Sequence, residues 1–352
     1  MQNQNLDITE QKKPASRMKY LQLVDYINSL IEDGTLQIGD QIPSLNQLQT
    51  QLHMSKETLL KGLNYLLEMG VIEAIYRKGY FVKKVSIGHS YHVFLLLDKM
   101  NVMREQIYRS IFNSLKDVGD IDIYFHHHNY KVFEKLIKEN LGNYTHYIIA
   151  TFLKEDVTDV LNLIPAEKRI IIDYNQQGLS GNYSCIYQDY GYDIFCSLMQ
   201  LQDRLKNYEK LILIARPEAI HAQQVINGFL HYCVKSELPY SIESNIEEKN
   251  FRKGNAYITF SRYDTDDVAL IKLAKKKGYE LGKEIGLISY NDTAVKEILE
   301  GGITVISTDF EMMGKTAASV ILDRNTVYKR NPTKVIICLL YTSPSPRDRQ
   351  KS

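Results

Sequence analysis

Polar side chains directly follow several apolar, strand-like stretches of this sequence. "FLLLD" ends in Asp98, and "RIIIDYN" ends in Asp173, Tyr174 and Asn175. In open α/β sheets, ligands bind outside the carboxyl ends of the strands. Carboxylates, amides and an aromatic face placed there can hold a small polar molecule. The candidate effector-binding residues of this kind are Asp98, Asn101, Phe152, Asp173, Tyr174, Asn175, Arg216, Arg262, Asp264, Asn291 and Asp292.

Each of these residues also has a structural alternative. Asp and Asn at strand ends often cap helices or form turns, without touching any ligand. The hypothesis of a binding cleft therefore depends on the set as a whole.

Catalytic motifs are absent from the sequence. It contains no G-x-S-x-G elbow, no G-x-x-x-x-G-K-[ST] phosphate loop and no H-E-x-x-H. The glycines of "GLSGNYS" do not have the spacing of a dinucleotide fingerprint, so we interpret that stretch as a loop. We assign no catalytic residue and no cofactor.

The run His126 to His128 could suggest a metal site. Adjacent residues of a strand point to opposite faces of the sheet, so three in a row cannot all face one ion. No cysteine or carboxylate stands at ligand spacing beside them. We therefore assign no metal ligand.

The composition is that of a globular protein. Of 352 residues, 44% are hydrophobic and 24% are charged, and the net charge is +1, so any basic surface has to be local. No long apolar run predicts a membrane helix, and the polar N-terminus lacks the apolar core of a signal peptide. The four cysteines show no paired spacing. These features predict a cytoplasmic protein.

The chain divides into several regions that differ in their residue pattern. We expect a disordered leader at 1–17, a helical region with a hairpin at 18–85, a linker at 86–90 and a long region of alternating strands and helices at 91–337. Such alternation predicts parallel, doubly wound sheets. The stretch 338–352 abandons this pattern, and "CLLYTSPSPRD" coincides with one translated frame of a common sequencing adapter. We interpret it as adapter-derived.

The region 18–85 has the pattern of a winged helix-turn-helix. A first helix ends at Gly34, Ser44 can cap a second, and Ser55 can cap a third. "VIEAIYRKGYFV" then predicts a hairpin with a basic tip. The third helix would enter the major groove of DNA, and the tip would contact phosphates. The alternative is a small helical dimerisation or docking domain.

The same residues carry a resemblance to the DNA-binding domain of the GntR family. "GDQIPSLNQLQTQLHMSKETLLKGLNYLLEMGVIEAIYRKGYFV" is similar to its pattern of a Pro-Ser turn, a Ser-x-x-Thr helix start and a closing Gly-x-Phe-Val. The resemblance implies DNA contacts from the turn, the start of the third helix and the wing tip. The candidates are Ser44, Asn46, Ser55, Lys56, Thr58, Lys61, Arg77, Lys78 and Gly79.

The region 18–85 departs from the family at three arginine positions. Asn46, Lys56 and Leu60 stand where the family has arginine. Lysine cannot reproduce the two-pronged hydrogen bonding of arginine to guanine, so we expect a different operator sequence.

The region 91–337 resembles the two-lobed domain of lactose-repressor and periplasmic-binding proteins. The stretches "KRIIIDYN", "QQVINGFLHYC" and "EIGLISYNDTAVKEILEGGITVISTDFEMMGKTAASVILD" carry the resemblance. It implies three crossings between lobes, which we place near Tyr187, Asp292 and Asp323. The first lobe would be 91–186 and 293–323, and the second 187–292 and 324–337. The family's sugar-binding arginine is replaced by Val225.

Together these features predict a ligand-responsive, DNA-binding transcription regulator. The predicted fold class is α/β, with a winged helix-turn-helix before a two-lobed periplasmic-binding-protein-like domain. We expect a bacterial repressor that acts as a homodimer on double-stranded operator DNA, has no membrane partner and binds a monosaccharide or a derivative. One alternative is a sugar-acting α/β enzyme with a helical N-terminal appendage. Another is a solute-binding transport component, which the absent signal sequence disfavours.

Overall fold

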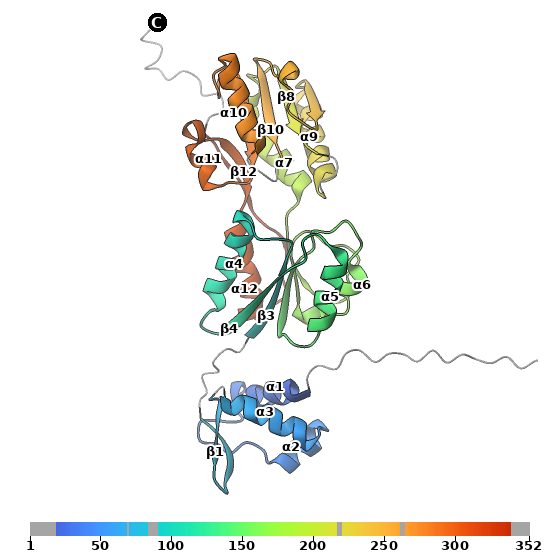
Figure 1. Ribbon diagram of the computed structural model, residues 1–352, viewed down its shortest axis with the longest axis vertical. Coiled ribbons are helices and arrows are strands. Elements are labelled where there is room, and N and C mark those ends of the chain that lie inside the picture. Colours follow the sequence, from blue (N-terminus) through green and yellow to red (C-terminus); the bar gives the residue numbers. More distant parts are fainter. Residues whose placement is uncertain (1–18, 69, 84–90, 217–219, 261–264, 339–352) are drawn as a thin grey trace, which may run out of the picture.

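The computed structural model describes residues 19–68, 70–83, 91–216, 220–260 and 265–338. The predicted leader and linker, and the adapter-like stretch beyond Cys338, lie outside these residues. Figure 1 shows three parts in succession along the long axis of the molecule. They are an N-terminal head, a first lobe and a second lobe.

The head is a winged helix-turn-helix, as predicted. Its elements are α1 (Lys19–Glu32), α2 (Leu45–Leu52), α3 (Lys56–Glu68), β1 (Ile72–Ile75) and β2 (Gly79–Val82). The Ser44 side chain accepts a hydrogen bond from the Gln47 backbone amide, and the Gln47 side chain accepts one from the Ser44 amide, which fixes the start of α2. β1 and β2 form an antiparallel hairpin, the wing.

Lobe 1 is built on a parallel sheet with the strand order β13-β7-β6-β5-β3-β4. Its elements are β3 (Tyr91–Leu97), α4 (Val102–Leu115), β4 (Gly119–Phe125), α5 (Tyr130–Asn140), β5 (His146–Ala150), α6 (Thr158–Leu161), η1 (Ala166–Lys168), β6 (Arg169–Asp173), β7 (Ser184–Tyr187), α12 (Phe310–Leu322) and β13 (Tyr328–Arg330). Helices α4 and α12 cover one face of the sheet, and α5 and α6 cover the other.

Lobe 2 repeats this architecture with the order β14-β12-β11-β10-β8-β9, in which only β14 is antiparallel to its neighbour. Its elements are α7 (Tyr190–Gln200), α8 (Gln202–Leu205), β8 (Lys210–Ile214), α9 (Ala222–Ser236), β9 (Tyr240–Glu243), η2 (Glu248–Asn250), β10 (Asn255–Thr259), α10 (Thr265–Lys277), β11 (Gly286–Tyr290), α11 (Ala294–Ile298), η3 (Leu299–Gly301), β12 (Thr304–Thr308) and β14 (Thr333–Ile336). Helices α7 and α9 pack on one face and α10 on the other.

Central strands of both sheets are buried along their whole length. β6, β10, β11 and β12 have no exposed residue. Sheets covered by helices on both faces demand such near-continuous apolar runs, which is why these strands stand out in the sequence. The mixed α/β architecture with two parallel sheets confirms the predicted fold class. No helix among the described residues is both long and apolar enough to cross a bilayer.

The chain crosses between the lobes after β7, after β12 and after β13. The first crossing follows Tyr187 directly. The second was predicted near Asp292 and lies instead after Thr308, because β12 pairs in parallel with β11 inside lobe 2. The third was predicted near Asp323 and lies after Arg330, because β13 pairs with β7 in lobe 1. Residues 293–308 therefore belong to lobe 2, and residues 324–330 belong to lobe 1.

Hydrogen bonds tie the three crossings together. The backbone amide of buried Asn331 donates to Tyr187 O at 2.7 Å, and its side-chain amide donates to Asp309 O at 2.9 Å. The Thr308 hydroxyl donates to the side-chain oxygen of Gln188. The hinge is thus one hydrogen-bonded unit, so movement at one crossing must disturb the others.

An ion pair also joins the lobes beside the hinge. Arg330 of β13 lies with its guanidinium 2.9 Å from a carboxylate oxygen of Asp193 on α7, and it packs over the ring of Tyr192. The Asp193 side chain is fully buried. Burial raises the pKa of Asp193 to about 6, although Arg330 opposes the shift.

We expect Asp193→Asn to gain stability relative to the parent protein as the pH rises from about 4 to about 7. In this window folded Asp193 keeps its proton up to pH about 6, whereas the unfolded chain releases it near 3.8. The folded state binds more protons, so ionisation of Asp193 lowers the free energy of unfolding as the pH rises, by up to about 3 kcal/mol. Asparagine cannot titrate.

Urea unfolding of both proteins at several pH values measures this difference. The matched control is Asp203→Asn in the same lobe, whose carboxylate is 92% exposed. A difference between parent and Asp193→Asn that stays constant across the pH range would contradict the expectation.

Candidate effector cleft and DNA-contacting head

A cavity with an empty volume of about 790 Å³ lies between the two lobes at the carboxyl ends of their strands. Lobe 1, the hinge and lobe 2 all contribute side chains. The lining residues are Asp98, Lys99, Asn101, Met103, Arg104, Phe152, Asp173, Gln188, Tyr190, Ile220, His221, Phe260, Tyr290, Asn291 and Phe310.

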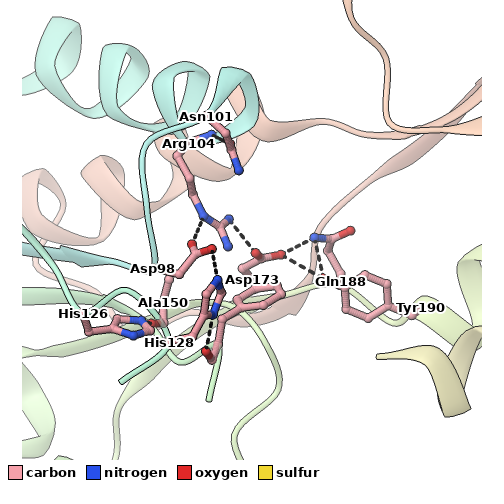
Figure 2. Close-up of polar contacts among 10 residues, drawn as sticks. Asp98, Asn101, Arg104, His126, His128, Ala150, Asp173, Gln188 and Tyr190 are labelled. Atoms are coloured by element: carbon pink, nitrogen blue, oxygen red, sulfur yellow. Dashed lines mark hydrogen bonds and ion pairs between the residues drawn. The ribbon is translucent and has the colours of Figure 1, made fainter. Parts of the chain in front are cut away.

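A buried arginine joins two carboxylates at the floor of lobe 1. Arg104 Nε donates to Asp98 Oδ1 at 2.6 Å, and its NH1 nitrogen lies 2.6 Å from Asp173 Oδ2. All three side chains are at most 5% exposed. Figure 2 shows the guanidinium, carried by the first turn of α4, between the two carboxylates. Charge-assisted hydrogen bonds of this kind are strong and fix the geometry of both partners.

The pKa directions agree with this arrangement. Burial opposes ionisation of Asp98, but the charge and hydrogen bond of Arg104 outweigh it and lower the pKa of Asp98. Burial likewise opposes the charge of Arg104, and the two carboxylates raise its pKa. Asp98 and Arg104 are therefore both charged at neutral pH, and the group contains two carboxylates and one guanidinium.

A polar chain continues from Asp173 to the hinge. Gln188 donates from its side-chain nitrogen to Asp173 Oδ1, and that nitrogen also lies 3.1 Å from the Tyr190 hydroxyl oxygen. The side-chain oxygen of Gln188 accepts from Thr308 at the second crossing. Figure 2 shows the contacts of Gln188 with Asp173 and Tyr190. The floor of the cavity is thus linked directly to two of the three crossings.

Aromatic rings from both lobes meet at His221, which lies at the start of α9. Tyr190 stacks on His221 with ring centres 4.2 Å apart and planes 9° apart. Phe152 and Tyr174 of lobe 1 approach the same ring at 4.6 and 5.1 Å. This aromatic group holds the lobes in contact and gives the cavity an apolar wall.

Asn291 lies at the lobe 2 side of the cavity, just after β11. Its backbone has a φ of 62°, in the left-handed region that asparagine tolerates better than most residues. Buried Lys296 donates to Tyr290 O at 3.0 Å and to Asn291 O at 2.8 Å, which supports this turn. Among the described residues, nothing hydrogen-bonds to Asn291 Oδ1, and this atom is buried.

The three histidines point to different partners. His126 Nε2 lies 3.2 Å from Ala150 O, and His128 Nδ1 lies 3.0 Å from Phe152 O. His127 and His128 both have positive φ, so the run turns away from strand geometry after β4. Burial lowers the pKa of His126 to about 4. Within the described ranges no group of three His, Cys, Asp or Glu residues could hold a metal ion.

The structure brings five of the candidate effector residues to the cavity and places four others elsewhere. Asp98, Asn101, Phe152, Asp173 and Asn291 line it. Tyr174 packs on His221 without lining the cavity. Asn175 accepts a hydrogen bond from Tyr328, Arg216 pairs with Asp266 at 3.1 Å, and the Asp292 amide donates to Ser307. Arg262 and Asp264 lie outside the described residues.

Several lining residues are missing from the sequence-based set. Arg104, Gln188, Tyr190, His221 and Tyr290 contribute the ion pair, the hinge contact and most of the aromatic wall. Only Arg104 had a local signal, because it stands in the first turn of a helix that Asn101 caps. The rest are helix starts or strand ends that no polar pattern distinguishes.

Of the candidate DNA-contacting residues, Ser44 and Asn46 are exposed at the start of α2, and the others lie on α3, at its cap or at the wing tip. Ser55 caps α3 by accepting from the Thr58 amide at 3.3 Å, and Lys56 is exposed in its first turn. At the wing tip Arg77 and Gly79 have positive φ, and the carbonyl of Lys78 accepts from Gln41. Lys61 instead lies over the ring of Tyr20, with its nitrogen 5.2 Å from the ring centre.

Comparison with known proteins separates the two parts of the chain. Residues 19–82 match the family described as bacterial regulatory proteins, gntR family. The HTH-type transcriptional regulator YydK of Bacillus subtilis is 39% identical over 67 residues, which are 19% of this chain and 28% of that protein. The mannosyl-D-glycerate transport/metabolism system repressor MngR of Escherichia coli is 34% identical over 70 residues, 20% of this chain and 29% of MngR. The chain thus spans under a third of these relatives.

The two-lobed part is similar in fold to solved regulators. A periplasmic binding protein/LacI transcriptional regulator from Alkaliphilus metalliredigens QYMF, complexed with D-xylulofuranose, superposes with a TM-score of 0.57 at 15% identity over 72% of this chain and 100% of that chain. A LacI family regulator from Enterococcus faecium with bound ribose gives 0.53 at 14% identity, over 71% and 98%. At such identities the likeness shows the fold alone.

Proposed function

We propose that this protein is a ligand-responsive transcription regulator that binds operator DNA through its head and a small molecule between its lobes. The observation that supports this most is the combination of a gntR-type head with a two-lobed domain whose interlobe cavity joins a polar floor to an aromatic wall. A DNA-binding head alone needs no ligand cavity, and a ligand-binding domain alone needs no DNA-binding head, whereas a ligand-responsive regulator needs both.

The proposed effector is a sugar. The structural neighbours with D-xylulofuranose and with ribose support a monosaccharide. Carboxylates and amides that accept hydrogen bonds from hydroxyls, beside aromatic surface, suit such a ring. The cavity residues Asp98, Asn101, Phe152, Asp173 and Asn291, together with Arg104, are the proposed contacts.

The proposed mechanism couples ligand binding to the hinge. Asp173 at the cavity floor contacts Gln188, which contacts Thr308 at the second crossing. A ligand that contacts Asp173 therefore acts on the crossings and favours one lobe arrangement. It shifts the population only as far as it binds one arrangement more tightly than the other. We propose that this change repositions the heads.

We propose that the protein acts as a homodimeric repressor. Dimeric helix-turn-helix proteins read two half-sites about one helical turn apart, which multiplies the specificity of a small head. α4 exposes Val102 and Phe112, and α11 exposes Val295 and Ile298, so the two-lobed part offers apolar surface for a second copy. Repression is the activity named for MngR.

Lys56→Ala is expected to weaken binding to the operator by about tenfold, because it removes a cation from the start of the recognition helix. The measurement is a gel shift at low salt with DNA from the promoter next to the gene. Sedimentation of the complex gives the number of chains bound.

The matched control is Lys135→Ala, which removes an exposed helical lysine from α5 of lobe 1, far from the wing. It should bind the operator as the parent does. If the parent protein ignores this DNA at low salt, or if both variants bind equally, the proposal of a DNA-binding regulator fails.

A further inference from the structure

We infer that the interlobe cavity selects an uncharged, polyhydroxylated ligand and rejects phosphorylated or carboxylated sugars. This inference rests on the proposed function and specifies the class of effector at the same site. It follows from the charges in the cavity and from a buried hydrogen-bond acceptor, Asn291 Oδ1, that has no partner among the described residues.

The cations of the lining are balanced by its carboxylates. The lining contains Asp98 and Asp173 against Lys99 and Arg104, so its formal charge, histidine aside, is zero. Arg104, the buried cation, already has one nitrogen 2.6 Å from each carboxylate. Its guanidinium also lies over the Phe152 ring, 4.8 Å from the ring centre. A phosphate would therefore meet a cation that two carboxylates have neutralised.

A buried anion without a dedicated cation is strongly disfavoured. Moving a charged group out of water costs several kcal/mol unless a partner compensates for it. At the floor of the cavity Asp98 and Asp173 would add repulsion, because their combined charge exceeds that of Arg104 by one, and Lys99 offsets this excess only for the lining as a whole. The cavity thus gives a sugar phosphate no binding advantage over the parent sugar.

The cavity contains a buried acceptor that still needs a donor. Asn291 lines the cavity, and its Oδ1 is a buried acceptor that no described residue satisfies. Sugar hydroxyls both donate and accept, whereas ionised phosphate and carboxylate oxygens only accept. A neutral polyol can therefore satisfy Asn291 Oδ1, and an anionic group cannot.

The test compares matched pairs of compounds on the full chain. Thermal shift and calorimetry would use D-ribose, D-glucose and D-galactose, D-ribose 5-phosphate, D-glucose 6-phosphate and D-galactose 6-phosphate, and the acids D-glucuronate and D-galacturonate. L-arabinose, D-xylose and L-fucose extend the neutral set. At least one neutral sugar should raise the melting temperature, and its charged partners should bind about 100-fold more weakly or worse. Inorganic phosphate should match sodium chloride at equal ionic strength.

A second variant links the selectivity to the carboxylates. Asp98→Asn removes one of the two carboxylates that contact Arg104 and leaves Arg104 paired with Asp173 alone. We expect this variant to bind neutral sugars more weakly. We also expect the ratio between its affinities for a neutral sugar and for the matching sugar phosphate to fall by about tenfold. Its melting curve and its operator binding verify that it folds.

The inference is overturned if a phosphorylated or acidic sugar binds the parent protein as tightly as its neutral partner, or if no neutral sugar of the panel binds. It is also overturned if Asp98→Asn leaves the discrimination unchanged while neutral-sugar binding falls. The regulator proposal is judged separately by operator binding. A sugar phosphate that binds the cavity and alters the gel shift would refute the selectivity and leave the regulator intact.

Discussion

Arg104→Met is expected to lower the free energy of unfolding by about 3–5 kcal/mol at neutral pH and to abolish effector binding. Without the guanidinium, Asp98 and Asp173 become two buried carboxylates with no cation between them. Removing one partner of a buried ionic group costs far more than the net value of the intact group, because a desolvated charge is left behind. Methionine roughly preserves the length and apolar volume of the side chain, so the loss is electrostatic.

The effect must depend on pH. In the parent protein Arg104 holds the pKa of Asp98 below its ordinary value, so Asp98 contributes stability that is lost as the pH falls through that range. In the variant the largest remaining influence on Asp98 is burial, which raises its pKa, while His128 opposes the shift. Its protonation then relieves the penalty in acid. The difference in unfolding free energy between parent and variant should therefore shrink as the pH falls from about 7 to about 4.

Arg109→Met is the matched control, because it alters the same helix at an exposed position. Arg109 pairs with Glu105 at 2.7 Å, and its side chain is 72% exposed, so its loss should cost under about 0.5 kcal/mol. Urea unfolding across pH and calorimetry with a neutral sugar give both readouts. Equal losses in the two variants, or a loss for Arg104→Met that does not change with pH, would rule out the electrostatic role.

The sequence predicted most of the fold because the sheets are buried on both faces. Runs such as "RIIIDYN" and "IGLISY" became β6 and β11, with no exposed residue in either strand. β13 was not predicted, because all three of its residues are exposed. Its pairing with β7 decides where the last crossing lies, and no local pattern encodes that pairing.

The crossing predicted near Asp292 shows a different limit. The turn after β11 has the polar residues of a strand end, and the sequence does not say which sheet the next strand joins. The register Ile288↔Thr304 places β12 beside β11 in lobe 2. The sheet that β12 joins is determined by long-range strand pairing, which the periodicity of the sequence does not reveal.

The candidate cleft was predictable only from its strand ends. Asp98 and Asp173 follow buried strands and are found at the floor of the cavity. Their partner Arg104 comes from a helix, and its role depends on two carboxylates that are far apart in sequence. Tyr190 and His221 reach the cavity because α7 and α9 pack closely, so their place depends on a helix contact rather than on a motif.

That helix contact leads to the second large effect, which we expect from Gly228→Ala. The change should lower the free energy of unfolding by about 2–4 kcal/mol. A Cβ at Gly228 would lie 2.1 Å from Gly191 O and 2.4 Å from Ile194 Cγ2, far inside van der Waals contact. The clash is with backbone on α7, so no side-chain rotation can relieve it and α9 has to move away.

Movement of α9 should also impair ligand binding, because both helices begin at the cavity. Tyr190 is the first residue of α7, His221 precedes α9, and their rings stack at 4.2 Å. Asn227→Ala is the matched control: its side chain is exposed on the same helix, and its loss should cost under about 0.5 kcal/mol. Urea unfolding and sugar calorimetry test both parts. If Gly228→Ala unfolds like Asn227→Ala and binds sugar normally, the close approach of α7 and α9 does not position the aromatic wall.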